Sequence, residues 1–184
     1  MNLKDKNIGF CLTGSFYTFK HTILQIKELV KAEANIIPIM SYNAYRTNTK
    51  FGNAKEFRED IEKITNNKII NTIPKAEHLG HKYMTDIIIV APCTGNTLAK
   101  LSNGIVDTPV LMAVKSNLRN DNPIVIAPST NDGLSGSAES IGKLLNRKNF
   151  FFVPFRQDNP ITKPRSPVFI KIGFYSFYMS KIKF

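Results

Sequence analysis

The stretch TDIIIVAPCTGNTLAKLSNGIVD, residues 85–107, decides the fold of this chain. It opens with Thr85–Val90, a run rich in β-branched and apolar side chains that is typical of a strand buried on both faces of a parallel sheet. Pro92 is expected to end that strand, and Gly95 permits a tight turn. A helix is expected from about Leu98 to Asn103. The stretch therefore predicts a strand, a polar loop at its carboxyl end, and a helix.

Strand and helix patterns alternate on both sides of this unit. The predicted strands are Asn7–Thr13, Asn35–Met40, Lys68–Thr72, Thr85–Val90, Pro123–Ala127 and Phe150–Val153. The predicted helices are Phe19–Ala32, Ala54–Thr65, Leu98–Asn103, Val110–Leu118 and Leu134–Arg147. Such alternation predicts a three-layer, Rossmann-like α/β fold with a mostly parallel sheet. Residues 1–164 are expected to form one domain, and Pro38 argues against a central position for the second strand.

The composition is that of a globular protein. The chain has 184 residues, 42% hydrophobic and 21% charged, which excludes a disordered, collagen-like or coiled-coil protein. No apolar run reaches the roughly 18 to 20 residues that cross a bilayer, so no membrane association is expected. The first residues resemble a strand rather than a secretory signal. Two cysteines, Cys11 and Cys93, suit a reducing cytoplasm better than a disulfide framework.

The net charge of +11 is unevenly distributed. Five cations and no acid lie between Lys163 and Phe184, and the rest of the chain carries +6. The remaining basic residues are scattered and are not interleaved with aromatic side chains. Nucleic acid is therefore not an expected partner.

The last residues, from about Arg165 to Phe184, form an atypical basic and aromatic tail. A terminal helix of a soluble α/β protein would normally carry acidic and basic residues on its outer face. Two interpretations stay open. The tail is either a segment that lies on the surface or under a partner, or the product of a changed reading frame in the source gene.

Polar loops follow four of the predicted strands, at the edge where open parallel sheets bind ligands. Glycine after the first strand lets the backbone approach an anion, and the helix that follows offers free N–H groups. The candidate residues are Gly14 and Ser15, then Ser41, then Thr94, Asn96, Thr97 and Lys100, and finally Asn131. Each loop by itself also fits a plain helix cap. No metal site is predicted.

Together these loops resemble the superfamily of FMN-binding, Rossmann-like flavoproteins that includes the flavin-containing cysteine decarboxylases. The decarboxylase segment P-x-S-x-N-T-x-x-K-x-A-x-G-x-x-D aligns with residues 92–107, with Thr94 in place of Ser and Ser102 in place of Ala. The positions that match are Asn96, Thr97, Lys100, Gly104 and Asp107. Of the segment P-A-M-N, Pro128 and Asn131 are kept.

Within the superfamily, the chain resembles the B subunits of a two-subunit oxidoreductase that makes a spore dicarboxylate. The resemblance reaches about Pro164 and includes VLMAVKSNLRN and VPFRQDNP. It implies a cytoplasmic protein, in the mother cell of a sporulating bacterium, that helps to oxidise a dihydro-level dicarboxylate precursor. It also implies homo-oligomers and, as partner, an A subunit that carries NAD(P).

The resemblance assigns roles to the candidate residues but leaves open whether FMN is retained. Gly14, Ser15 and Ser41 would hold a phosphate or carboxylate. The wall of the pocket would be formed by Thr94, Asn96, Thr97 and Lys100. Asn131 would approach the reacting group, while Lys115 and Arg119 would bind the substrate carboxylates.

Two other functions stay open. One is an FMN-dependent decarboxylase of a cysteine-derived carboxylate, with His78 as acid or base, because His78 precedes Asp86 by the spacing of the decarboxylase histidine. The motif around His78 is lost, however, and both His78 and His81 also fit a polar loop. The other is a non-catalytic scaffold for the A subunit. Cys11 is expected to be structural, and Cys93 to face the pocket without a paired base.

Overall fold

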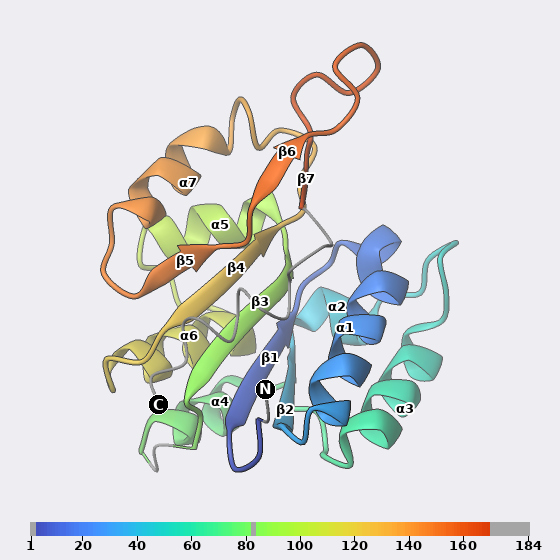
Figure 1. Ribbon diagram of the computed structural model, residues 1–184, viewed down its shortest axis with the longest axis vertical. Helices are drawn as coiled ribbons and strands as arrows, with labels where there is room; N and C mark the ends of the chain where they lie inside the picture. Colours follow the sequence, from blue (N-terminus) through green and yellow to red (C-terminus); the bar gives the residue numbers. More distant parts are fainter. Residues whose placement is uncertain (1–2, 82–83, 170–184) are drawn as a thin grey trace.

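Five parallel strands form the central sheet of the protein, whose computed structural model describes residues 3–81 and 84–169 (Figure 1). The strands are β1 (Asn7–Leu12), β2 (Asn35–Met40), β3 (Ile87–Cys93), β4 (Ile124–Pro128) and β5 (Phe150–Phe152). They lie in the order β2-β1-β3-β4-β5, and each neighbouring pair is parallel. The strand order therefore reverses between β1 and β3, which is where such sheets bind ligands.

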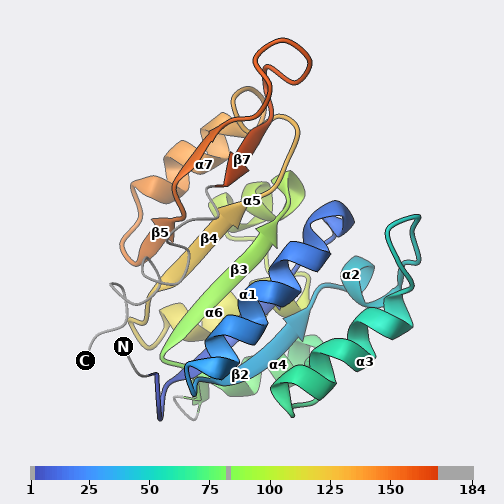
Figure 2. The same cartoon turned by 45° about the vertical axis from the view of Figure 1, so that its right-hand side comes forward.

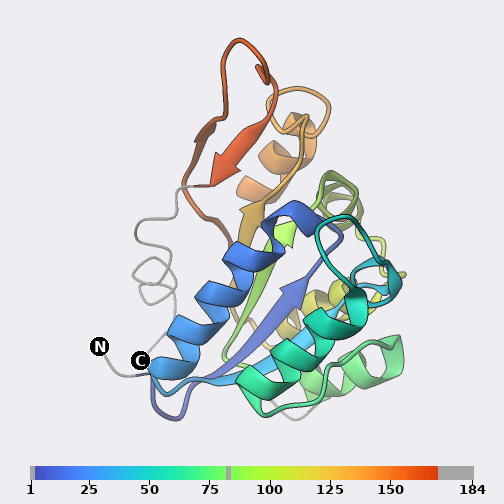
Figure 3. The same ribbon diagram turned by 90° about the vertical axis from the view of Figure 1, so that its right-hand side faces the viewer.

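Helices cover both faces of this sheet and make the three layers that the sequence predicts (Figures 2 and 3). One face packs against α1 (Phe19–Lys31) and α3 (Ala54–Thr65). The opposite face packs against α4 (Ile73–His81), α5 (Gly95–Ser102), α6 (Pro109–Leu118) and α7 (Ala138–Leu145). Two short elements, η1 (Phe16–Thr18) and α2 (Tyr42–Arg46), follow β1 and β2. The predicted fold class is confirmed.

Strand β3 occupies the centre of both hydrophobic layers, and all seven of its residues are buried. Ile87 and Ile89 belong to the core beneath α1, whereas Ile88 and Val90 belong to the core beneath α6. This alternation is the physical reason for an apolar run with no polar face. The strand that carries Pro38, β2, lies at an edge of the sheet, as the missing proline N–H requires.

The prediction that Pro92 ends the central strand is wrong. β3 continues through Pro92 to Cys93, because the Pro92 carbonyl accepts a hydrogen bond from the N–H of Thr13. The register against β4 shifts between Val90 and Cys93, which accommodates the residue that cannot donate. Helix α5 also begins earlier than predicted, at Gly95.

Three other segments differ from the sequence-based prediction. The short helix α2 lies inside the predicted polar loop, and Ser41 caps its N-terminus, since the Ser41 hydroxyl accepts a hydrogen bond from the N–H of Ala44. His78 and His81 lie on a helix, α4, and not in a loop. The predicted strand Lys68–Thr72 is reduced to one bridge between Ile39 and Ile70.

A small antiparallel hairpin of β6 (Phe155–Gln157) and β7 (Pro167–Phe169) projects beyond the carboxyl edge of the main sheet (Figure 1). The predicted tail begins inside this hairpin, since its residues 167–169 form β7. The rest of the tail, residues 170–184, lies outside the described residues, so the boundary at residue 164 stays a prediction. In the described ranges, no helix has the length and apolarity of a membrane span.

Alanine substitutions at two glycines should change the free energy of unfolding in opposite directions. A Cβ on Gly80 of α4 would lie 2.7 Å from the Ser116 carbonyl oxygen of α6, whereas a Cβ on Gly142 of α7 meets nothing within 4 Å. We expect Gly80→Ala to lower the free energy of unfolding by about 1–3 kcal/mol through overpacking. Gly142→Ala should raise it by about 0.5–1 kcal/mol, because alanine is favoured over glycine inside a helix. Urea unfolding measures both, and a neutral Gly80→Ala would contradict the close α4–α6 packing.

Candidate functional site

Thr13 joins the loop after β1 to the loop after β3. Its hydroxyl donates to the Pro92 carbonyl at 2.7 Å and accepts the N–H of Thr94 at 3.0 Å. Thr13 is 1% exposed, so these groups are shielded from water and depend on one another. This side chain therefore links the two loops, together with the backbone hydrogen bond from the Thr13 N–H to the Pro92 carbonyl.

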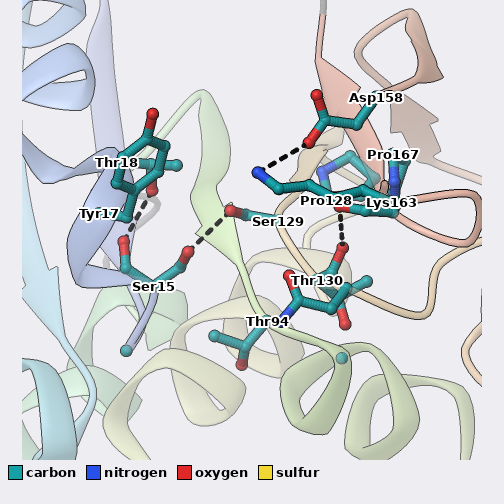
Figure 4. A pocket seen from close by; sticks show the side chains of 14 residues that line it. Ser15, Tyr17, Thr18, Thr94, Pro128, Ser129, Thr130, Asp158, Lys163 and Pro167 are labelled. Atoms are coloured by element: carbon teal, nitrogen blue, oxygen red, sulfur yellow. Dashed lines mark hydrogen bonds and ion pairs between the residues drawn. The ribbon is translucent and has the colours of Figure 1, made fainter. Parts of the chain in front are cut away.

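One side of the joined loops is hollowed to a volume of about 440 Å³, and we name this space the hairpin hollow (Figure 4). The hydroxyls of Ser15 and Ser129 lie 2.7 Å apart and connect the loops after β1 and β4. Lys163 and Asp158, from the β6–β7 hairpin, form an ion pair of 3.3 Å in the same lining. The other lining residues are Gly14, Tyr17, Thr18, Thr94, Gly95, Pro128, Thr130, Asn131, Ser166 and Pro167.

A second space of about 370 Å³ adjoins α5, and we name it the helix hollow. The Thr94 and Thr97 hydroxyls lie 3.0 Å apart there, and Lys100 pairs with Asp107 at 2.6 Å. The other lining residues are Thr13, Gly14, Ser41, Tyr42, Asn43, Asn96, Thr108 and Leu111. Gly14 and Thr94 line both spaces, so the two hollows adjoin at the β1–β3 junction.

Hydrogen-bond donors are concentrated at this junction. The N–H groups of Gly14, Gly95 and Asn96 have no acceptor among the described residues. Those of Gly95 and Asn96 lie in the first turn of α5, where the helix dipole favours negative charge. A Cβ on Gly95 would lie 2.8 Å from the hydroxyls of Thr130 and Ser137, so the close approach of the β4–α7 loop requires glycine there. The junction is suited to an anionic group.

The β4–α7 loop is held by Asp132. Its carboxylate accepts the hydroxyls of Thr130 at 2.5 Å and Ser137 at 2.8 Å. The hydrogen bond from the Thr130 hydroxyl is the main cause that holds the pKa of Asp132 below its usual range, and the bond from the Ser137 hydroxyl acts in the same direction. The loop that presents Asn131 is thus ordered by an ionised carboxylate.

The structure brings together eight of the residues predicted for the site. Two line both hollows and the others line one of them; the eight are Gly14, Ser15, Ser41, Thr94, Asn96, Thr97, Lys100 and Asn131. Their roles stay predictions. Ser41 and Thr94 are in addition helix caps, which is the plainer interpretation of the same residues.

Three predicted residues lie elsewhere. His78 is exposed on α4, and Lys115 and Arg119 are exposed at the carboxyl-terminal part of α6 and just beyond it. The Arg119 guanidinium lies 3.3 Å from Nδ1 of His81. The chain runs from α4 into β3 and from α6 into β4, so these helices end near the amino ends of the strands, opposite the hollows.

Neither cysteine lines a hollow. Cys93 was expected to face the pocket, but it is fully buried in the core beneath α6, as is Cys11. Burial raises the pKa of both thiols, which keeps them protonated. Across the described ranges, no group of three or more His, Cys, Asp or Glu side chains is arranged to hold a metal ion.

Sequence reasoning missed six residues of the hairpin hollow, including Ser166 and Pro167 of the hairpin. Tyr17 and Thr18 come from η1, and Asp158 and Lys163 come from the β6–β7 hairpin. The turn-forming run DNP at residues 158–160 signals a hairpin. Nothing local indicates that this hairpin folds over the loop after β1.

Replacing Thr13 tests the junction. Thr13→Val keeps the shape but removes the hydroxyl, which leaves the Thr94 N–H without its acceptor. We expect the free energy of unfolding to fall by about 1–3 kcal/mol. Thr13→Ser keeps the hydroxyl and should recover most of the loss caused by Thr13→Val. Equal stability of the valine and serine variants would contradict the role assigned to the hydroxyl.

Comparison with known proteins supports the same fold. The family model described as Flavoprotein matches residues 1–162. The B subunit of dipicolinate synthase from Bacillus subtilis is 45% identical over 167 residues, which cover 91% of this chain and 84% of that protein. Among solved structures, the corresponding B subunit from Bacillus halodurans superposes with a TM-score of 0.90 at 38% identity, covering 99% of this chain and 93% of that one.

A more distant solved structure shares the fold alone. DmrB from Burkholderia xenovorans, in complex with FMN, has a TM-score of 0.65 at 20% identity and covers 80% of this chain and 87% of that one. The similarity to the B subunits of dipicolinate synthase extends over nearly the whole chain, including the hairpin. On the match of the family model and on this similarity, the chain belongs to the flavoprotein family.

Proposed function

We propose that this protein serves as the B subunit of a dipicolinate synthase. The observation that carries the proposal is the 45% identity to the Bacillus subtilis protein over 91% of the chain. In this role it contributes to the oxidation of a dihydrodipicolinate-level precursor during sporulation, in the cytoplasm of the mother cell. It acts together with an A subunit that holds NAD(P). A homo-oligomer is also proposed, and the distant DmrB structure is described as a cubic protein cage.

The two hollows fit an FMN molecule. Its phosphate suits the helix hollow, where hydroxyls and the unpaired N–H groups of Gly14 and Asn96 converge. Its flat ring suits the hairpin hollow, whose walls include Pro128, Pro167 and Tyr17. The volume of 440 Å³ lies within the range of about 300–1,000 Å³ typical of small-molecule sites. Bound there, FMN would supply a two-electron acceptor beside the substrate.

In this proposal, the side chains of the two hollows bind and orient the cofactor and the substrate. Ser15 and Ser129 present hydroxyls at the boundary of the ring site. The Asn131 amide, which has no partner among the described residues, orients a carbonyl or carboxylate of the substrate. The Lys100–Asp107 pair borders the phosphate site. Neither hollow is lined by a described histidine or cysteine, so no observation favours the decarboxylase alternative.

Titration of the purified chain with FMN tests the cofactor assignment, both without and with the A subunit. We expect saturable binding with a Kd of about 1 μM or tighter, seen as quenched flavin fluorescence. Ser15→Glu should weaken binding at least about tenfold, because it adds bulk and negative charge to the lining of the hairpin hollow, where the ring is placed. Ser135→Glu makes the same change on an exposed loop outside both hollows and should leave binding unchanged. No saturation in either preparation would remove FMN from the proposal.

Reconstitution tests the activity. The chain is mixed with FMN, NAD(P) and the A subunit of the Bacillus subtilis synthase, and dipicolinate is followed by its ultraviolet absorbance. We expect turnover that requires both proteins and falls at least about tenfold in Asn131→Ala, because an oriented substrate contact is lost. His78→Asn, far from the hollows, should retain full activity. An unchanged rate in both Asn96→Ala and Asn131→Ala would indicate a scaffold instead of a catalytic role.

A further inference from the structure

The β6–β7 hairpin is a fixed wall of the hairpin hollow. The N–H of Asp158 donates to the Ser166 carbonyl at 2.8 Å, and the N–H of Leu134 donates to the Arg165 carbonyl at 3.0 Å. A Cβ on Gly133 would lie 2.5 Å from Cγ of Pro167, so the hairpin packs against the β4–α7 loop at a distance that only glycine allows. The hairpin therefore presents its side chains from a defined position.

The tip of the hairpin fixes the backbone of Lys163. The Asn159 side-chain oxygen accepts the N–H groups of Ile161 at 2.9 Å and Thr162 at 2.8 Å. The Lys163 N–H then donates to the Asn159 carbonyl at 2.9 Å. From this backbone, the Lys163 side chain extends into the space that also contains Ser129 (Figure 4).

Among the described residues that line the hairpin hollow, Lys163 is the one with a positively charged side chain. Its ammonium group is only partly paired. Its ammonium lies 3.3 Å from Asp158 and makes no hydrogen bond with other described residues, and 60% of its side chain is exposed. Lys100 in the helix hollow differs, because its side chain is 25% exposed and donates to Asp107 at 2.6 Å. An ammonium group has three donors, so Lys163 can pair with Asp158 and still bind an anion.

We propose that Lys163 binds one carboxylate of the dicarboxylate substrate, with Asp158 as a positioning residue that holds the ammonium over the hollow. The inference rests on the proposed function and names the residue that recognises the acid. The Asp158 charge disfavours an anion that does not contact Lys163, so the pair selects for a carboxylate placed at the hairpin. The hydroxyls of Ser15 and Ser129 remain for the opposite side of the ligand.

Binding of dipicolinate to the FMN-loaded chain, measured by calorimetry without turnover, tests this inference. Lys163→Gln should weaken binding by roughly tenfold or more, because a charge-assisted hydrogen bond is lost. Lys163→Arg keeps the charge and should recover most of that affinity. Arg156→Gln removes the same charge from an exposed position on β6 outside both hollows and should bind as the parent chain does. FMN affinity should be the same in all four proteins.

The outcomes separate this inference from the proposed function. Dipicolinate binding that is absent in the parent chain, or unchanged in Lys163→Gln, overturns the role of Lys163. Equal losses in Arg156→Gln and Lys163→Gln overturn it too, because the effect would then be general electrostatics. Lys163-dependent binding without turnover in the reconstituted synthase supports the site and rejects the proposed reaction. In an active synthase, Lys163→Gln should raise KM by the factor seen in binding and leave kcat within about threefold.

Discussion

The hydrogen bonds of Thr13 connect the sheet to the site. Parallel strands end at a common edge, but the loops beyond that edge have no ladder to hold them. Here one buried hydroxyl donates to the β3 carbonyl at Pro92 and accepts the N–H that opens the turn into α5. Gly14 and Thr94, the residues next to these bonds, line both hollows. The hydrogen bonds of Thr13 thus help to set the positions of the residues at which the two hollows meet.

Each hollow combines neutral donors with one lysine–aspartate pair among its described lining residues. The pairs are Lys100–Asp107 and Lys163–Asp158, and in both the formal charges of that lining cancel. At the β1–β3 junction, an anion would then be attracted chiefly by N–H groups and hydroxyls, whose orientation is fixed by the fold. The two pairs differ in how closely the lysine ammonium is bound to its aspartate. Lys100 is committed to a short hydrogen bond, whereas Lys163 retains donors for a ligand.

The described lining of the two hollows contains no histidine and no cysteine. His78 and His81 lie on α4, away from the hollows, and burial keeps the thiols of Cys11 and Cys93 protonated. Under the proposed function, the side chains of the site bind and orient, and the redox chemistry is left to FMN or to the A subunit. That division of labour agrees with the similarity to the B subunit of dipicolinate synthase.

The amino-acid sequence by itself determined the alternation of strands and helices, the buried centre at β3, and the eight loop residues at the carboxyl edge. Period, β-branching and turn residues are local signals, and parallel strands must bring their carboxyl-terminal loops to one edge. Only the tertiary structure decided how far β3 extends, because the Pro92 carbonyl is used by a partner 79 positions away. Likewise, the placement of His78, Lys115 and Arg119 away from the site, and of Lys163 within it, depends on packing. Gly80 against Ser116 and Gly133 against Pro167 fix those positions, and such long-range fits leave no periodic signal in the sequence.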